Sequence, residues 1–304
     1  MNIGYCCINL SLNENLPKKD KVLVNRGMIK RTFLKKGLDY VSEIALLNLK
    51  DTIKILQWNI DNDIKVYRLS STSFPWFTEY DFENLPRFSK IQMLLKRIGT
   101  IVKSNELRVS YHPGPFNVLS STRQDVVEKT IDELNKHAQL MDYMELDQST
   151  YYPINIHIGN TKPSLEESAN KFCENFEFLS ESCKSRLTVE NDDSVNQYSV
   201  KDLYEMVHKK IGIPIVFDQH HYLCGKQDQT MEESLTTALS TWKTKAVTHM
   251  SSSKKIEVEK SKKTAHADYI YEPIQTFGMD FDIEIEAKAK DLAVLKYRED
   301  YARN

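Results

Sequence analysis

Short apolar runs in this chain alternate with longer segments whose apolar residues recur every three or four positions. The run 213–217 reads Ile-Pro-Ile-Val-Phe and is apolar throughout, which is typical of a strand covered on both faces in a parallel sheet. Within 38–61 the apolar residues follow helical spacing, which predicts an amphipathic helix. The predicted strands are 3–8, 65–69, 107–111, 154–158, 187–189, 213–217, 246–250 and 283–285. The predicted helices are 38–61, 89–104, 123–142, 164–183, 199–210, 231–242 and 287–301.

This alternation predicts an α/β fold, because neighbouring parallel strands require long crossover connections that are usually helical. Eight predicted strands fit a closed (β/α)8 TIM barrel, and we expect a single domain over residues 1–304. An open, doubly wound sheet is the alternative. The loop after the first predicted strand has no GxGxxG sequence, and no P-loop sequence occurs in the chain, which disfavours nucleotide-binding versions of that alternative.

Composition says more about the cellular environment of the protein than about its fold. Apolar residues make up 40% and charged residues 28% of the 304 residues, as in ordinary globular proteins. The five cysteines form no CxxC pair, so we expect reduced thiols in an intracellular, cytoplasmic protein. Neither a signal peptide nor an apolar run of membrane-spanning length is evident, so no membrane contact is expected. No oligomerisation surface is evident either, and we expect a monomer. The net charge of −2 argues against bulk electrostatic binding of nucleic acid but permits a local basic face.

Candidate chemistry gathers at the ends of the predicted strands. Six of the eight histidines end a strand or lie in the loop after one: His112, His157, His220, His221, His249 and His266. Glu190, Asp218 and Glu286 occupy the same level. The carboxyl ends of all strands meet at one face of a barrel, where such enzymes hold their active site. His137 and His208 fall within predicted helices and are interpreted as packing or surface residues.

Imidazole and carboxylate groups without thiolate suit Mn, Fe, Zn or Co, and the number of candidate ligands is enough for two or three ions. The alternative is a set of independent buried polar networks. That alternative is disfavoured because burying many charged groups without a metal is energetically costly.

Short motifs at these strand ends make the chain resemble the UV damage endonucleases, which share their barrel with endonuclease IV and, more distantly, with sugar isomerases. The motifs are Gly4-Tyr5…Asn9, Arg68-Leu69-Ser70-Ser71, His112-Pro113-Gly114, His157-Ile158-Gly159, Glu190-Asn191-Asp192-Asp193, Asp218-Gln219-His220-His221, His249-Met250-Ser251-Ser252, His266-Ala267-Asp268 and Glu286-Ala287-Lys288. Each motif is short, but their order and spacing along nearly the whole chain are specific.

The resemblance implies a site with three divalent ions, with Mn²⁺ expected and Zn²⁺ or Co²⁺ as alternatives. It assigns His112, His157 and Glu190 to one ion, Glu190, Asp218, His249 and Glu286 to a second, and His221 and His266 to a third. Glu190, His249 and Glu286 are the implied catalytic residues. The implied substrate is damaged double-stranded DNA, cut immediately 5′ of a UV photoproduct to leave a 3′-hydroxyl and a 5′-phosphate.

The chain departs from the family pattern at three positions. Family members commonly carry Gln-Tyr after His-Pro-Gly as a wedge into the duplex, where this chain has Pro115-Phe116. Phe116 keeps a stacking face, whereas Pro115 has no side-chain hydrogen bond to offer. Relatives also carry a lysine, modified to a carbamate, two positions before the strand-seven histidine; Val247 stands there, so we expect no carbamylated ligand and a weaker third site. Thr72 follows Arg-x-Ser-Ser in place of His or Asp, which puts a base contact there in doubt.

Further DNA contacts are expected on the rim of the barrel mouth. Tyr5 and Asn9 resemble the lesion-contacting pair of the family and are expected inside the mouth. The lysine-rich segment 251–265 is interpreted either as a loop that tracks phosphates or as a solvated mobile loop.

Three other functions compete with the leading one: an abasic-site endonuclease, a sugar isomerase, and a barrel without catalytic activity.

Overall fold

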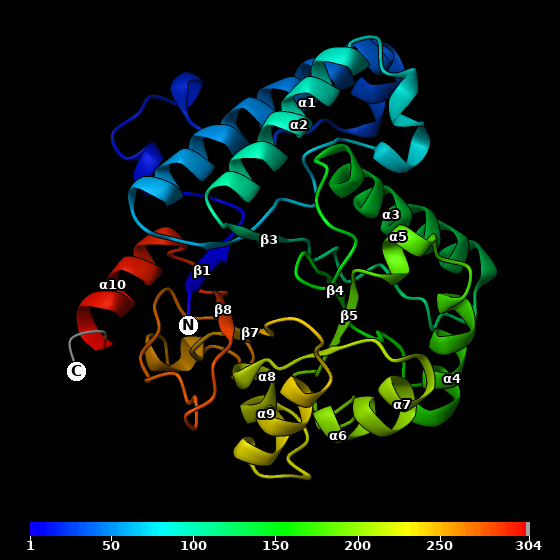
Figure 1. Ribbon diagram of the computed structural model, residues 1–304, viewed down its shortest axis with the longest axis vertical. Helices are drawn as coiled ribbons and strands as arrows, with labels where there is room; N and C mark the ends of the chain where they lie inside the picture. The colour runs from blue at the N-terminus through cyan, green and yellow to red at the C-terminus, as the bar shows by residue number, and fades with distance from the viewer. Residues whose placement is uncertain (302–304) are drawn as a thin grey trace.

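A barrel of eight parallel strands forms the centre of the computed structural model, which describes residues 1–301 (Figure 1). The strands are β1 (Ile3–Cys6), β2 (Val66–Arg68), β3 (Arg108–Ser110), β4 (Ile154–Ile156), β5 (Leu187–Glu190), β6 (Ile215–Val216), β7 (Val247–Met250) and β8 (Asp282–Ile285). Five of them pair in the order β3-β2-β1-β8-β7 and three in the order β4-β5-β6. Single parallel bridges, Tyr111 with Ile154 and Asp218 with His249, join the two sheets at both seams. The predicted (β/α)8 barrel is therefore confirmed.

Helices surround the strands, as the alternating pattern predicts. The main ones are α1 (Lys30–Asp61), α2 (Phe88–Ser104), α3 (Gln124–Tyr143), α4 (Leu165–Phe176), α5 (Glu181–Lys184), α6 (Val200–Leu203), α7 (Lys209–Ile211), α8 (Gln219–Cys224), α9 (Met231–Ser240) and α10 (Asp291–Tyr301). A π-helical segment, η5 (Tyr204–His208), joins α6 to α7, and short 3₁₀ turns occur in the loops, among them η1 (Ser11–Asn13) and η6 (Lys254–Ile256).

Several predicted boundaries are wrong, and side-chain caps explain two of them. The predicted helix 164–183 is two helices, because Ser180 begins α5 as a new N-cap that accepts from the Cys183 amide. The predicted helix 199–210 contains η5 in its middle. His220 and His221 are in helix α8 rather than in a loop, because the Asp218 side chain caps that helix by accepting from the His221 amide. The strand around 213–217 has only two residues in regular pairing, Ile215 and Val216.

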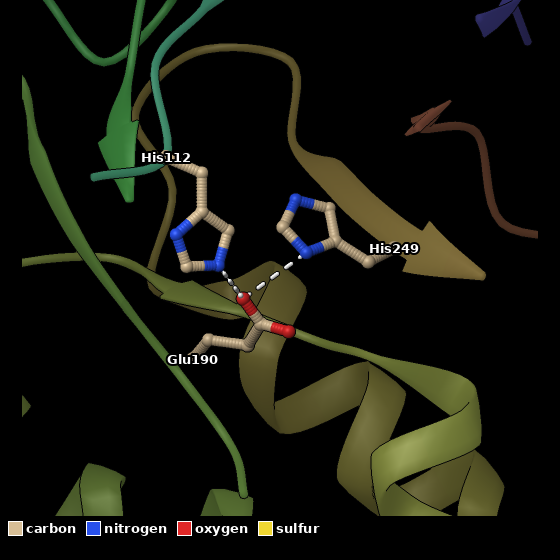
Figure 2. Close-up of side chains that lie close together, drawn as sticks. All are labelled: His112, Glu190 and His249. Atoms are coloured by element: carbon tan, nitrogen blue, oxygen red, sulfur yellow. Dashed lines mark hydrogen bonds and ion pairs between the residues drawn. The ribbon is translucent and has the colours of Figure 1, made fainter. Parts of the chain in front are cut away.

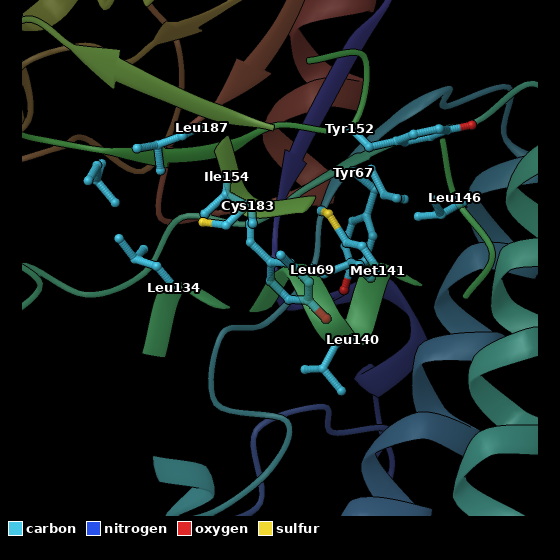
Figure 3. Close-up of a cluster of buried hydrophobic side chains, with 14 of the residues drawn as sticks. Tyr67, Leu69, Leu134, Leu140, Met141, Leu146, Tyr152, Ile154, Cys183 and Leu187 are labelled. Atoms are coloured by element: carbon cyan, nitrogen blue, oxygen red, sulfur yellow. The ribbon is translucent and has the colours of Figure 1, made fainter. Parts of the chain in front are cut away.

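The hydrophobic core lies between the strands and the surrounding helices. Figure 3 shows part of it, and its labelled buried side chains include Tyr67 and Leu69 from the β2 region and Leu134 and Met141 of α3. Gly4 is required at its position because a Cβ there would lie 1.7 Å from the Val66 carbonyl oxygen. His137 is fully buried in this layer and its Nδ1 lies 2.8 Å from the Glu133 carbonyl, which confirms its packing role.

The inside of the barrel, unlike the outer layer, is polar and is built in levels. Alternate residues of a strand face the same side, and Asp282, Glu284 and Glu286 follow this rule along β8 and beyond its end. At the lowest level Asp282 meets Arg108, and at the next Glu284 meets Arg68 and Ser110. Glu286 lies at the uppermost level, at the carboxyl ends of the strands, where the candidate site is found.

All five cysteines are free thiols, as predicted. None of the described helices is long and apolar enough to cross a membrane.

Candidate metal centre

The carboxylate of Glu190, the last residue of β5, is the meeting point of four histidines. His112 follows β3 and places its Nε2 3.1 Å from Glu190 Oε2. His249 lies in β7 and places its Nδ1 3.1 Å from the same oxygen, as Figure 2 shows. His221 Nδ1 lies 3.1 Å from Glu190 Oε1, and His157 Nε2 lies 3.7 Å from Oε2. Glu190 is fully buried.

Two groups of side chains in residues 1–301 have donor atoms close enough to hold a metal ion. One consists of His112, Glu190 and His249, and the other of His157, Glu190 and His221. Glu190 belongs to both, which matches the bridging position that the sequence resemblance implies. The histidines are divided differently from that implication, because His249 is grouped with His112 and His221 with His157.

Asp218, Glu286 and His266 lie around these groups without joining them. One oxygen of Asp218 caps α8, accepting from the His221 amide at 2.7 Å, and the other, Oδ2, is buried without a hydrogen-bond partner. Glu286 Oε1 lies 3.6 Å from His249 Nδ1, and its Oε2 lies 3.6 Å from His266 Nδ1. The rings of His221 and His266 are 6.3 Å apart, so these two are neighbours but share no three-residue group.

An unpaired buried atom indicates that this centre fits a divalent cation. Asp218 Oδ2 lacks a hydrogen-bond partner although it is buried, and an orphaned buried polar group costs free energy. Burial by itself would favour the neutral acid of Glu190, but the nearby imidazoles of His249 and His157 hold the pKa of Glu190 well below its usual value. A deprotonated carboxylate among imidazoles is the donor set that Mn²⁺, Zn²⁺ and related ions bind.

Arg68, which sequence reasoning left without a role, reaches the centre from β2. Its Nε donates to Glu284 Oε2 at 2.7 Å, its Nη1 pairs with Glu286 Oε1, and its Nη2 lies 2.8 Å from His249 Nε2. Burial opposes the ionisation of Glu284, but the charge of Arg68 and the contact with His249 lower the pKa of Glu284 to about 2. An arginine in an otherwise apolar strand was the sequence signal for such an interior contact.

Asp192 is a second residue that the sequence reasoning missed, although it belongs to the Glu190-Asn191-Asp192-Asp193 motif. Its Oδ1 lies 2.9 Å from His157 Nδ1, while the other ring nitrogen of His157 faces Glu190. A carboxylate on the far nitrogen fixes the tautomer and orientation of a metal-binding imidazole. Asn155 on β4 also donates to Glu190 Oε2, so the central carboxylate is held by amide as well as imidazole groups.

The expectation that Tyr5 and Asn9 lie inside the mouth is wrong. The Tyr5 hydroxyl donates to Asn59 of helix α1 at 2.7 Å and accepts from Asn9 Nδ2 at 2.8 Å. Asn9 Oδ1 accepts from the Leu12 amide at 2.7 Å. Both side chains are fully buried because they tie β1 to α1 and to the start of η1. Their contact with DNA therefore stays a prediction that this arrangement does not favour.

The other rim residues are placed as follows. Pro115 and Phe116 are exposed on the loop after His112, and 88% of the surface of Phe116 is accessible. Val247 is buried in β7, and Lys245 pairs with Asp280 at 3.0 Å and Asp282 at 3.1 Å near the opposite end of the barrel.

The lysine-rich segment 251–265 is joined to the site by an antiparallel bridge between Ser253 and His266. Lys254 of η6 pairs with Glu257 and, at 2.9 Å, with Asp268. The interpretation of this segment as a phosphate-tracking loop stays a prediction.

A hollow of about 290 Å³ opens beside the metal centre. His157, His221, Asp192 and Pro115 are among the residues that line it. The centre of histidines and carboxylates lies at the carboxyl ends of the strands, next to a cavity. This placement defines the class of protein: a (β/α)8-barrel enzyme with a site suited to metal-assisted chemistry.

Comparison with known proteins identifies the family within that class. A family model described as UV-endonuclease UvdE matches residues 1–303. The "UV DNA damage endonuclease" of Bacillus cereus (strain 03BB102) is 33% identical over 98% of this chain and 93% of that protein. The protein of the same name from Clostridium perfringens (strain 13 / Type A) is 30% identical over 97% of this chain and 69% of that protein. The chain belongs to the UvdE family and is an endonuclease of that family.

Solved structures agree with this assignment. The crystal structure of SacUVDE superposes with a TM-score of 0.85 at 29% identity, covering 100% of this chain and 98% of that one. The apo form of 3-keto-D-glucoside 4-epimerase YcjR from E. coli has a TM-score of 0.58 at 8% identity, covering 100% of this chain and 98% of that one. That second similarity concerns the barrel fold alone.

Proposed function

We propose that this protein is a metal-dependent repair endonuclease that nicks duplex DNA immediately 5′ of UV photoproducts, leaving a 3′-hydroxyl and a 5′-phosphate. The substrates are cyclobutane pyrimidine dimers and 6-4 photoproducts. The observation that carries the proposal is the Glu190 carboxylate shared by two donor groups at the barrel mouth, in a chain that belongs to the UvdE family.

In this proposal eight side chains hold two or three divalent ions: His112, His157, Glu190, Asp218, His221, His249, His266 and Glu286. Bound ions of this kind activate water and neutralise charge on a phosphate. Mn²⁺ is the proposed ion because imidazole nitrogens bind it better than they bind Mg²⁺. Glu190, His249 and Glu286 are the proposed catalytic residues at the centre of the set.

Neighbouring residues of the chain keep these ligands in place. Arg68 donates to Glu284 and pairs with Glu286, so the carboxylate of Glu286 has a fixed direction and one oxygen left over. Asp192 holds the ring of His157. Because these supports are buried on rigid strands and their ends, the ligand atoms need little reorganisation when a charged phosphate arrives.

Phe116 is the proposed wedge that selects damaged DNA. A photodimer stacks and pairs poorly, so opening the duplex there costs less than at intact thymines. An exposed aromatic ring that fills the gap favours the opened state at lesions. Phe116 is exposed, and its neighbours Pro115 and Asn117 line the cavity at the metal centre, which supports this role.

The decisive experiment compares nicking and binding of a duplex that carries one defined photodimer with those of an abasic duplex, in Mn²⁺ and at one salt concentration. The expected result is a strong preference for the photodimer. Phe116→Ala should weaken binding of the photodimer duplex by about 5- to 150-fold, because base–aromatic stacking contributes that much. The abasic duplex should be affected much less.

Pro115→Ala is the matched control, since it alters the same loop without removing stacking surface. Equal losses on both duplexes would mean that Phe116 only supports the loop. Equal nicking of both duplexes by the unaltered protein would favour the abasic-site endonuclease instead. Absence of any nicking, with turnover of small sugars, would favour the isomerase.

A further inference from the structure

The two histidines that the family resemblance assigns to a third ion are held in the same way. His221 Nδ1 lies 2.9 Å from the carbonyl oxygen of Asn191, and His266 Nδ1 lies 3.0 Å from the carbonyl oxygen of Glu286. A carbonyl oxygen can only accept a hydrogen bond, so each neutral ring has its proton on Nδ1 and a free lone pair on Nε2. The ring centres are 6.3 Å apart. Each ring therefore has one nitrogen left for an ion.

The lysine-rich segment 251–265 leads directly into His266 and is folded back on itself. Ser253, near its start, forms the antiparallel bridge with His266. The amide of Lys254 donates to the carbonyl of Ala265 at 2.6 Å. These backbone contacts close the base of the segment, so the position of His266 depends on how the rest of the segment is held.

Glu257 connects the outer part of the segment to the chain just beyond His266. Its Oε1 accepts from the Asp268 amide at 2.7 Å and from the Tyr271 hydroxyl at 2.8 Å. Its carboxylate also pairs with Lys254. Because Asp268 is only two positions after His266, one side chain fixes the backbone on the far side of this ligand.

Lys263 connects the same segment to α8, the helix that contains His221. Its Nζ donates to the carbonyl of Leu223 at 2.5 Å. Its own carbonyl oxygen accepts from Ser253 Oγ at 2.7 Å and lies 3.8 Å from Cys224 Sγ, which donates to it. The segment therefore contacts the elements that carry both histidines.

We propose that Glu257 and Lys263 are positioning residues, which hold His266 beside His221 before an ion binds. Because it assumes that these two histidines share an ion, this role rests on the proposed function. A free loop would have to be ordered on binding, which reduces the affinity. The apparent dissociation constant rises in inverse proportion to the fraction of molecules in the competent arrangement. Lys254 and Lys263 are thus engaged within the protein.

The test titrates the metal-free full-length chain with Mn²⁺ and follows free Mn²⁺ by electron paramagnetic resonance, which separates tight from weak sites. Glu257→Ala should weaken the weakest site by about 10-fold, the lower end of the range for a residue that supports a metal ligand. The tighter sites should not change. Glu257→Gln keeps an oxygen that accepts from the Asp268 amide and should retain most of the affinity. Glu259→Ala, two positions further on and exposed, is the matched control and should leave all sites unchanged.

Two further variants connect the weakest site with this segment. His266→Ala should abolish the site that Glu257→Ala weakens. Lys263→Met should weaken the same site less than Glu257→Ala does, because the lysine contact is exposed to solvent. Lys262→Met, at the preceding exposed lysine, is its control and should have no effect on Mn²⁺ affinity.

Unchanged Mn²⁺ affinity in Glu257→Ala, or an equal loss at every site, would overturn the positioning role. Urea unfolding in chelator checks that each variant folds. If Glu257→Ala does not fold, equal Mn²⁺ affinities of Lys263→Met and Lys262→Met would overturn the role instead. Weaker binding of the photodimer duplex in chelator, with normal Mn²⁺ affinity, would assign the segment to DNA and also overturn it.

The endonuclease proposal is tested separately, by nicking of the photodimer duplex by the unaltered protein in excess Mn²⁺. If the unaltered protein nicks but Glu257→Ala binds every ion normally, only the positioning role is wrong. If the unaltered protein does not nick at photodimers, the proposed function itself fails, whatever the affinities of the variants.

Discussion

Buried charges occur at both ends of the barrel interior, but only the lower group is fully paired. At the lower end, Arg108 donates to the carbonyls of Tyr151, Thr150 and Ala246 and lies 3.4 Å from Asp282. Asp282 also accepts from Asn2 and pairs with Lys245 at 3.1 Å. At the upper end, beside the Glu190 centre, Asp218 Oδ2 is buried without a hydrogen-bond partner.

The two ends of the barrel interior differ because they contain different kinds of charged side chain. Arginine keeps its proton at any physiological pH, so Arg108 requires a permanent negative charge, and the lower group is complete without a ligand. Histidines can be neutral and can turn a lone pair toward a cation. A complete network of buried charges therefore indicates a structural role, and an incomplete network rich in imidazole indicates a binding site.

The largest expected effect comes from neutralising the upper carboxylate. Glu190→Gln should lower nicking of a photodimer duplex by about 10³-fold, as expected when a central charge-stabilising group is lost, and should reduce bound Mn²⁺ measured by atomic absorption. The free energy of unfolding of this variant, measured with urea in the presence of chelator, should change little, because the surrounding imidazoles can stay neutral. Glu205→Gln, at an exposed carboxylate on η5, is the control. Full metal content with a normal rate would remove Glu190 from the centre of the site.

The matching change at the lower end should produce the opposite pattern. Asp282→Asn leaves the charge of Arg108 buried without the carboxylate that pairs with it, which should cost about 3 kcal/mol in the free energy of unfolding. Bound Mn²⁺ and the nicking rate of the folded protein should be preserved. Urea unfolding in chelator and metal analysis of the same preparations test both statements. Metal loss without a loss of stability would contradict the structural role of the lower group.

The smallest expected effect concerns a residue that supports the upper centre without contacting Glu190. Asp192→Asn should weaken Mn²⁺ affinity by about 10- to 100-fold, the usual cost of losing a carboxylate that orients a ligating imidazole. Competition with a metal-sensitive dye measures this affinity. Asp193→Asn, in the next position and on the same cavity, should leave the metal affinity unchanged. Equal effects of the two variants would point to general negative charge rather than to the orientation of His157.

Sequence patterns predicted the barrel well and the contacts within it poorly. Apolar runs and helical spacing located every strand and the main helices, because burial on two faces or on one stripe leaves a local periodic signal. Asp218 shows the limit of such signals: its role as the cap of α8 moved His220 and His221 from a predicted loop into a helix. Tyr5 shows a second limit, because strand alternation does not say which side chains face the inside of the barrel. Its hydroxyl donates a hydrogen bond to Asn59 of α1.

The sequence by itself determined the order of the elements and the kinds of side chain at the carboxyl ends of the strands, since both are properties of neighbouring residues. It also carried the family motifs, and with them the expectation that Glu190 is shared by two groups of ligands. Only the tertiary structure decided which of these groups meet. Arg68 and Glu286 are 218 positions apart in the chain, and His112 approaches His249 only because β3 and β7 both end at the barrel mouth. Closure of the barrel brings such distant residues together, and no local periodicity encodes that contact.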